Sequence, residues 1–112
     1  MGKFSRNKGK AGEREFANIM KDWLGGLGRT IARRIEQTRD SGHDLDGLEP
    51  FAVEVKRQET LSVPAWWRQA KKSADVAGLR PALAYRRNGE AWRVMVELTP
   101  EEFATVIREC EK

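Results

Sequence analysis

The chain has 112 residues, a length that suits one domain with a modest core and excludes two separate domains. Its hydrophobic fraction of 39%, with four Trp and four Phe, excludes a disordered polypeptide. The formal net charge is +4, and the sequence has neither an apolar run near the roughly 20 residues of a membrane span nor a signal segment after its basic start, so a cytoplasmic location without membrane contact is expected.

The N-terminal part predicts a single helix. Residues 1–9 combine Lys and Arg with Gly, Ser and Asn, and we expect a flexible basic arm there. From Lys10 to Leu24 the apolar residues follow the i, i+3, i+4, i+7 and i+8 spacing of an amphipathic helix; they are Phe16, Ile19, Met20, Trp23 and Leu24. Glycines at 25, 26 and 28 end this helix, and residues 10–112 are expected to form one domain.

Five strands and two further helices are expected after this helix. The strands are predicted over Thr30–Glu36, Asp44–Leu48, Phe51–Arg57, Leu79–Arg87 and Ala91–Leu98. Asn88-Gly89 between the last two strands is a strong hairpin signal, because both residues tolerate positive φ. Helices are predicted from Pro64 to about Ala77 and from Thr99 to the C-terminus. The order α-β-β-β-α-β-β-α indicates a mixed α/β domain.

Charge is unevenly distributed along the chain. Residues 1–39 carry ten Lys or Arg against four Asp or Glu, and residues 56–87 carry eight against two. Residues 40–55, between them, hold five acids and no Lys or Arg. Basic surface attracts phosphates, and clustered carboxylates hold the divalent cations that act on phosphates. The pattern therefore favours a metal-dependent enzyme acting on a polyanion, with an ordinary charged surface as the alternative.

The strand around Glu54 carries the most informative pattern. Side chains alternate in a strand, so Glu54 and Lys56 share one face while Val53 and Val55 point into the core. If this strand pairs with the preceding one as a hairpin, Asp44 lies near Glu54, and the two carboxylates with a backbone carbonyl from residue 55 would suit Mg²⁺. Lys56 could then orient or deprotonate a water, or stabilise phosphate charge. The alternative is an ion pair on an exposed edge strand.

Other residues add to this site or to a DNA-binding surface. Glu13 lies near the apolar face of the first helix, where a carboxylate is costly to bury unless a cation or donor meets it; a solvated Glu13 at a frayed helix end is the alternative. The second predicted helix should pack through Trp67, Ala70, Ala74 and Ala77, leaving donors for phosphates beside that stripe. The expected DNA-binding residues are Lys8, Lys10, Arg57, Arg68, Gln69 and Lys72, although a solvated helix face and a solubilising tail would also account for the basic residues.

Several site classes are excluded. His43 is the only histidine, so histidine metal clusters and Ser-His-Asp triads cannot be built. Cys110 is the only cysteine, which excludes an internal disulfide. The glycine-rich stretch at 25–28 follows a helix and lacks the Lys-Ser/Thr ending of a phosphate loop, so no nucleotide cofactor is expected.

A set of short motifs gives the chain a family resemblance. The runs Lys8-Gly9, Glu13-Arg14-Glu15-Phe16, Asp44-Leu45 and Glu54-Val55-Lys56-Arg57 are similar to those of the archaeal-type Holliday junction resolvases and their phage relatives. These proteins belong to the PD-(D/E)XK nuclease superfamily, and the resemblance covers about residues 8–98. It implies a mixed five-stranded sheet flanked by helices, as in restriction endonucleases. It also implies a homodimer that cuts two strands symmetrically, and Mg²⁺ or Mn²⁺ as cofactor.

The resemblance also implies roles for individual residues. By position, Asp44 and Glu54 would bind metal, Lys56 would be the catalytic lysine, and Glu13 would be the helix-borne acid that completes the catalytic site. Gln69 corresponds to a helix glutamine found in parts of the superfamily. His43 stands where many members have Pro. The acid is also doubled, so Asp46 is an alternative to Asp44 as metal ligand.

These residues together predict a metal-dependent, structure-selective DNA endonuclease that acts on Holliday or other branched junctions. One alternative is a sequence-specific or end-processing nuclease of the same fold. Another is a catalytically silent nucleic-acid-binding module, which would bind DNA in a salt-dependent manner without needing metal.

Overall fold

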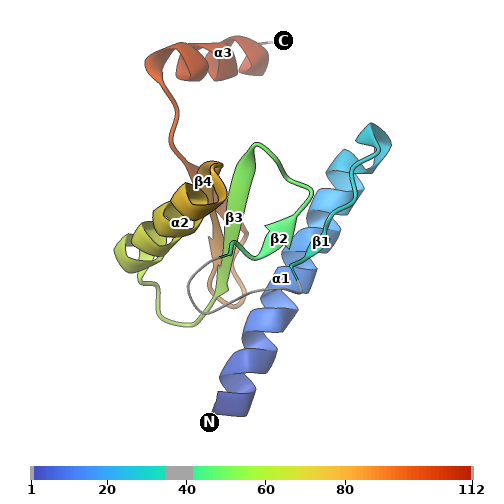
Figure 1. Ribbon diagram of the computed structural model, residues 1–112, viewed down its shortest axis with the longest axis vertical. Coiled ribbons are helices and arrows are strands. Elements are labelled where there is room, and N and C mark those ends of the chain that lie inside the picture. Colours follow the sequence, from blue (N-terminus) through green and yellow to red (C-terminus); the bar gives the residue numbers. More distant parts are fainter. Residues whose placement is uncertain (1, 35–41, 112) are drawn as a thin grey trace.

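The computed structural model describes residues 2–34 and 42–111 of the chain (Figure 1). Its elements are α1 (Gly2–Leu24), a 3-10 turn (Gly25–Leu27), β1 (Ala32–Arg33), β2 (Leu45–Asp46), β3 (Phe51–Arg57), α2 (Val63–Ala77), β4 (Arg80–Arg86), β5 (Arg93–Val96) and α3 (Pro100–Cys110). This succession confirms the predicted order of helices and strands. None of the helices in the described part is long and apolar enough to cross a membrane.

The five strands form one mixed sheet in the order β1-β2-β3-β4-β5. β3 and β4 are parallel and are joined by the crossover through α2, whereas the other neighbouring strands are antiparallel. β3 is therefore the middle strand of the sheet. The alternative that Glu54 and Lys56 lie on an exposed edge strand is wrong, because β2 and β4 pair with the two sides of β3.

Helices α1 and α2 cover opposite faces of this sheet (Figure 1). The larger core cluster lies on the α1 face, where Phe16 and Ala17 pack on Val53 and Val55 of β3. The cluster on the α2 face is built around Trp66, Ala70 and Leu83. Apolar residues at helical spacing meet alternate residues of the strands, and this match gives the domain its three layers.

The packing stripe of α2 differs from the prediction by one position. Trp66, rather than Trp67, is buried with Ala70, Ser73 and Ala74. The 66-70-73-74 set follows the 3.6-residue period as well as the predicted set does, so periodicity alone could not choose between adjacent tryptophans. The shift places a serine hydroxyl at the helix–sheet interface.

Several elements also differ in extent from the predictions, and β2 (Leu45–Asp46) and β5 (Arg93–Val96) are shorter at both ends than predicted. Helix α1 begins at Gly2, not near Lys10, so residues 2–9 are helical rather than an irregular arm; no proline interrupts them, and extending a formed helix adds a hydrogen bond per residue. β1 covers only Ala32–Arg33, and the predicted end of that strand at Glu36 lies outside the described residues. In the hairpin only Gly89 has positive φ, because six residues, 87–92, connect β4 to β5 and relax the turn.

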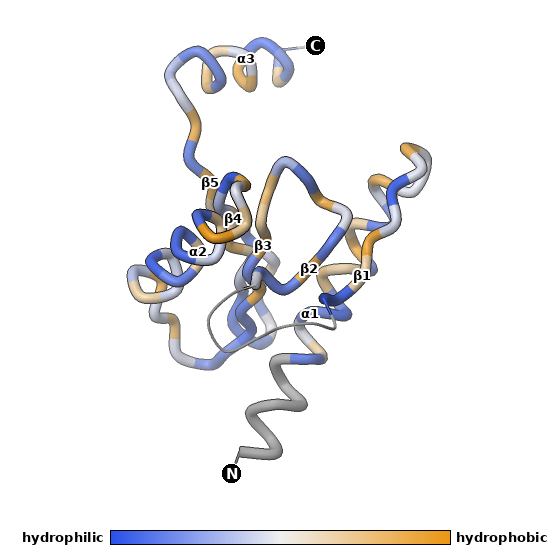
Figure 2. The backbone as a smooth tube through the Cα atoms, in the orientation of Figure 1, coloured by the Kyte–Doolittle hydropathy of each residue, from blue (hydrophilic) through white to orange (hydrophobic). Residues whose placement is uncertain are grey.

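Helix α3 stands apart from the layers (Figure 1). Its start is well defined: Thr99 and Glu102 form a reciprocal capping box, and Glu102 accepts hydrogen bonds from Arg80 at 2.5 and 2.8 Å. Hydrophobic residues recur along the helix in Figure 2, yet Phe103, Val106 and Ile107 are about half exposed. The apolar face of this amphipathic helix is therefore not covered by any other element in the described part of this chain.

Candidate active site

A polar pocket of about 530 Å³ opens beside the middle of the sheet. It is lined by Glu13, Asp44, Glu54, Val55, Lys56, Arg57, Gln58, Glu59, Thr60 and Gln69. Helix α1 supplies Glu13, the bend just before β2 supplies Asp44, β3 supplies Glu54 and Lys56, and α2 supplies Gln69. The fold thus brings four separate segments of the sequence to one cavity.

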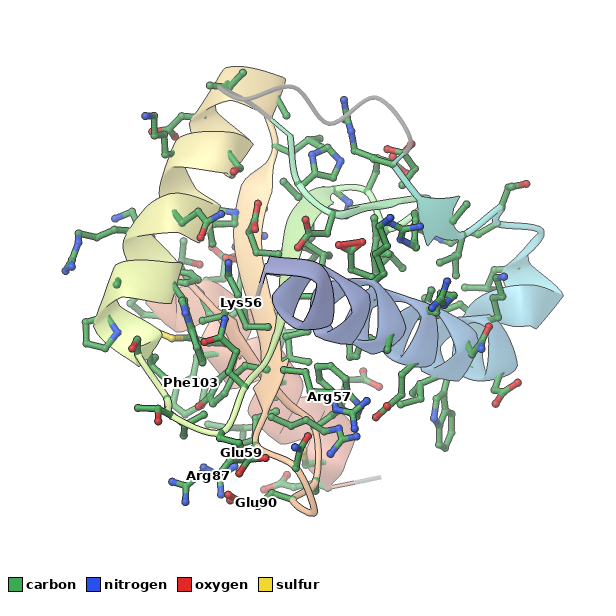
Figure 3. The ribbon with its side chains drawn as sticks, turned by 90° about the horizontal axis from the view of Figure 1, so that it is seen from below. Lys56, Arg57, Glu59, Arg87, Glu90 and Phe103 are labelled. Carbon is green, nitrogen blue, oxygen red and sulfur yellow. The ribbon has the colours of Figure 1, made fainter. Side chains whose placement is uncertain are left out.

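The pleat of β3 divides its side chains between the two helices. Glu54 faces α2, where Ser73 is a hydrogen-bond partner, and Lys56 follows on the same side. Arg57 faces α1, whose Gly12 lies against the Arg57 side chain. Figure 3 shows Lys56 on the side of α2 and Arg57 on the side of α1.

Asp44 is fixed to β3 by backbone and side-chain bonds. Its amide donates to the Val53 carbonyl at 2.8 Å, and its Oδ2 accepts from the Val55 amide at 2.7 Å. The pairing of Leu45 with Val53 sets this register. Burial, and then the nearby charge of Glu54, raise the pKa of Asp44 to about 8. The carboxyl therefore remains protonated near neutral pH as long as no cation compensates its charge.

Glu54 is almost completely buried, with 2% of the residue exposed. Burial raises its pKa, while hydrogen bonds with Ser73 and Asp44 and the charge of Lys56 partly oppose this shift. Its Oε1 atom has no hydrogen-bond partner among the described residues. A buried oxygen of this kind is costly unless something absent from the isolated chain completes it.

Glu13 is buried as well, at 8% exposure, and its Oε2 accepts a hydrogen bond from Arg33 Nε at 2.8 Å. Arg33, on β1, is not among the site residues predicted from the sequence. Arg33 holds the Glu13 carboxylate from the β1 side, and among the described residues no three acidic, His or Cys side chains are grouped tightly enough to enclose a metal ion. The Asp44–Glu54 pair is the close carboxyl pair, and Glu13 lines the same cavity beside it.

Arg57 lies at the cavity and is already engaged by other side chains. Its guanidinium donates to Glu15 at 3.3 Å and to Asn88 at 3.0 Å. Glu15 also accepts from Arg86 and from the Trp92 indole, and the hydrogen bond from Arg86 is the main reason that the pKa of Glu15 lies below its usual range. Glu15 is not among the site residues predicted from the sequence, where it appears only within the motif Glu13-Arg14-Glu15-Phe16.

Three of the other predicted DNA-binding residues, Lys10, Arg68 and Lys72, do not line the pocket. Lys10, Arg68 and Lys72 are exposed on helices α1 and α2, and Lys8 lies on α1 at a position whose side chain is not described. Gln69 alone of the predicted α2 residues lines the cavity. The structure therefore separates pocket residues from a basic helix surface near them.

Asp46, the alternative metal ligand, does not line the pocket. More than half of its side chain is exposed, and it lies 3.5 Å from His43 Nε2 and 3.7 Å from Arg34. His43 is buried next to it, and burial is the main cause that lowers the pKa of its imidazole. Asp44, rather than Asp46, is the acid that the fold directs toward Glu54.

Comparison with known proteins agrees with this geometry. The family model described as "Phage putative PDDEXK endonuclease" matches residues 4–111. Among curated protein sequences, nothing matches the chain. The solved structure of Hjc, a Holliday junction resolvase from the hyperthermophilic archaeon Archaeoglobus fulgidus, is similar with a TM-score of 0.50 and 22% identity over 82% of this chain and 78% of that one. Since the family model spans nearly the whole sequence, the chain belongs to the phage PDDEXK endonuclease family, with a restriction-endonuclease-like fold.

Proposed function

We propose that this chain is a divalent-metal-dependent DNA endonuclease that selects branched junctions, such as the Holliday junction, and hydrolyses their phosphodiester bonds. The observation that carries the proposal is the convergence of Glu13, Asp44, Glu54 and Lys56 on one polar pocket. Three acids and an amine in a cavity flanked by basic helices suit a polyanionic substrate and a hard cation.

The donor set fits Mg²⁺, for which Mn²⁺ could substitute. Asp44 and Glu54 offer carboxylate oxygens, the class of ligand that these cations prefer, and Glu54 Oε1 is buried without a protein partner among the described residues. Burial is the main cause of the raised pKa of both carboxyls, and a bound cation would favour their charged forms. Glu13, which lines the same cavity from α1 and is held by Arg33, would join the set when a cation binds. When bound, the ion would polarise the phosphodiester and lower the pKa of an attacking water.

The protein groups around that position have distinct parts in the reaction. Lys56 places an ammonium group on the same face of β3 as Glu54, where it can hold a water or a phosphate oxygen and stabilise the charge that develops on it. The Gln69 amide, from α2, can orient the same oxygen. Lys8, Lys10, Arg68 and Lys72 would contact flanking phosphates and set the register of the DNA.

Branched DNA and a homodimer belong to the proposal for two reasons. The similar archaeal structure is that of a Holliday junction resolvase, and resolving a junction requires two symmetric cuts. In addition, the apolar face of α3, defined by Phe103, Val106 and Ile107, is exposed and could meet its own copy about a twofold axis.

The proposal is tested by incubating the purified full chain with four-way junctions, flaps, linear duplex and single strands of matched sequence. With Mg²⁺ or Mn²⁺ we expect the junction to be cut fastest, and EDTA to abolish cleavage. Glu54→Gln should lower the cleavage rate at least about 100-fold, because it removes a cation ligand without changing side-chain size.

Asp46→Asn is the control, since Asp46 is an acid of the neighbouring strand β2 that lies outside the pocket. We expect it to cleave at close to the wild-type rate. Equal resistance of every substrate to wild type and Glu54→Gln would reject the nuclease proposal. Faster cutting of linear duplex than of the junction would reject junction selectivity alone.

A further inference from the structure

The Glu15 carboxylate accepts hydrogen bonds from three side chains, one on β3, one on β4 and one just before β5. Arg86 of β4 donates to Oε1 at 2.7 Å and to Oε2 at 3.0 Å. Arg57 of β3 donates to Oε2 at 3.3 Å, and the Trp92 indole, just before β5, donates to Oε1 at 2.7 Å. The Arg86 side chain is only 12% exposed. A buried guanidinium needs a counter-charge, so Glu15 cannot be replaced by an apolar residue without cost.

Two further contacts fix α1 at the same place. A Cβ added at Gly12 would lie 3.0 Å from Arg57 Cβ, so the helix backbone approaches β3 as closely as a glycine permits. The Trp92 ring, in turn, packs on Phe16 with centroids 5.2 Å apart, and Arg86 lies over that ring. The contacts of Glu15 and Gly12 therefore restrict both sliding of α1 over the sheet and rotation of α1 about its axis.

Glu13 and Glu15 point to different sides of α1. Two residues apart on a helix of 3.6 residues per turn, they are separated by roughly 200° around the axis. Glu13 is directed to Arg33 and the pocket, and Glu15 to β3, β4 and the Trp92 loop. A rotation of α1 that loosened one carboxylate would displace the other.

We propose that Glu15 is a positioning residue of this nuclease, which anchors α1 to β3 and β4 and thereby holds the Glu13 carboxylate at the cation site. The Glu15 carboxylate does not line the pocket. It therefore acts on the Glu13 carboxylate indirectly, by fixing how α1 is rotated and positioned on the sheet. This inference rests on the proposed function in one respect: Glu13 is taken to serve a bound cation.

The experiment measures Mn²⁺ binding to the full chain by electron paramagnetic resonance of the free ion. Glu15→Gln keeps the size of the side chain and removes its charge. Glu102→Gln is the matched control, because Glu102 also accepts two hydrogen bonds from one arginine at similar exposure, 36% against 34% for Glu15, but belongs to α3. Amide hydrogen exchange of residues 10–17 is followed in the same samples.

We expect Glu15→Gln to weaken Mn²⁺ binding about tenfold, as removal of partners that orient metal ligands does, while Glu102→Gln leaves it unchanged. Exchange of residues 10–17 should become faster only in Glu15→Gln. Unchanged Mn²⁺ affinity in Glu15→Gln, or equal weakening in both variants, would overturn the inference. If Glu15→Gln does not fold, Trp92→Phe is the second variant, because it removes one hydrogen-bond donor to Glu15 and keeps an aromatic ring on Phe16. It should also weaken Mn²⁺ binding, and wild-type Mn²⁺ affinity in this variant would overturn the inference.

Failure of the proposed function would look different. A wild-type chain that binds no Mn²⁺ contradicts the cation site itself. Hydrogen exchange then tests separately whether Glu15 anchors α1. If it does, the amides of residues 10–17 exchange faster in Glu15→Gln than in Glu102→Gln. Equal exchange rates in the two variants would show that it does not.

Discussion

Individual residues at the candidate site are held in an unfavourable state in the isolated chain. Asp44 and Glu54 are two acids brought together by strand pairing, and both have raised pKa values because burial disfavours their charged forms. Groups of this kind reduce stability and are common where a site is prepared for a charged ligand. The site is thus stabilised less by its own contacts than by what it would bind.

The contribution of Asp44 to stability without divalent metal should fall as pH rises from about 4 to about 8. The unfolded Asp44 carboxyl loses its proton near 3.8, whereas the folded one keeps it up to about 8, so the folded state binds more protons across this window. Asp44→Asn keeps an oxygen that can accept from the Val55 amide. In EDTA at pH 8 it should be more stable than wild type by about 1–3 kcal/mol, as judged by urea unfolding.

Asp46→Asn serves as the control for this pH effect. More than half of the Asp46 side chain is exposed, so its replacement should change the fall in stability with pH much less than Asp44→Asn does. An Asp44→Asn chain that is less stable than wild type at pH 8 would show that the carboxyl at position 44 is not a source of instability. Added Mn²⁺ should stabilise wild type more at pH 8 than at pH 5, because cation binding must displace the proton.

At the level of elements, one glycine decides how β2 approaches β1. Gly47 follows β2 with φ of 92°, and a Cβ there would lie 2.1 Å from the Thr30 carbonyl oxygen and 2.9 Å from Ile31 Cα. The backbone before β1 therefore passes directly over this residue. Since β2 also sets the position of Asp44 relative to β3, the close approach supports the site as well as the sheet.

Gly47→Ala should lower the free energy of unfolding by about 3 kcal/mol or more, because it combines an unfavourable φ with a backbone clash. Gly89→Ala isolates the first of these effects: Gly89 has φ of 80° and no atom within 4 Å of the added Cβ. It should cost only about 1–2 kcal/mol. Similar losses for the two variants in urea unfolding would show that space at Gly47 is not limiting.

At the scale of the molecule, two apolar surfaces built from described residues are uncovered. One is the α3 face already described. The other is a groove of about 320 Å³ between the second half of α1 and the sheet, lined mainly by apolar residues that include Met20, Leu24 and Val94. Contiguous apolar surface on a small domain with this many charged residues is typical of an association site.

We expect the chain to be a dimer in sedimentation velocity, with α3 at the interface. Phe103→Glu should weaken dimerisation by at least about 30-fold, because an exposed aromatic at an interface typically contributes 2 kcal/mol or more. Val76→Glu is the control: Val76 is an equally exposed apolar residue on α2. A monomeric wild type at all concentrations, or equal dissociation of both variants, would exclude α3 as the dimer surface.

The sequence by itself determined the order of elements and the face on which the main acids lie. The limits of α2, β3 and α3 were predicted to within about a residue or two, because periodic apolar residues, Pro64 and the Thr99 cap act within a few positions of the elements they define. Alternation along β3 likewise placed Glu54 and Lys56 on one face before any tertiary contact was known.

Only the tertiary structure decided which charges meet. The partners of Glu15 lie 42, 71 and 77 residues away, and Glu13 is paired with an arginine 20 residues away. The same holds for Ser73, which reaches Glu54 because Trp66 rather than Trp67 enters the core. The chain has 21 Lys and Arg, so the sequence alone does not show which of them forms an ion pair with a given acid. The packing of α1 and α2 on the sheet makes the choice, because it brings a few of them within hydrogen-bond distance and leaves the rest in solvent.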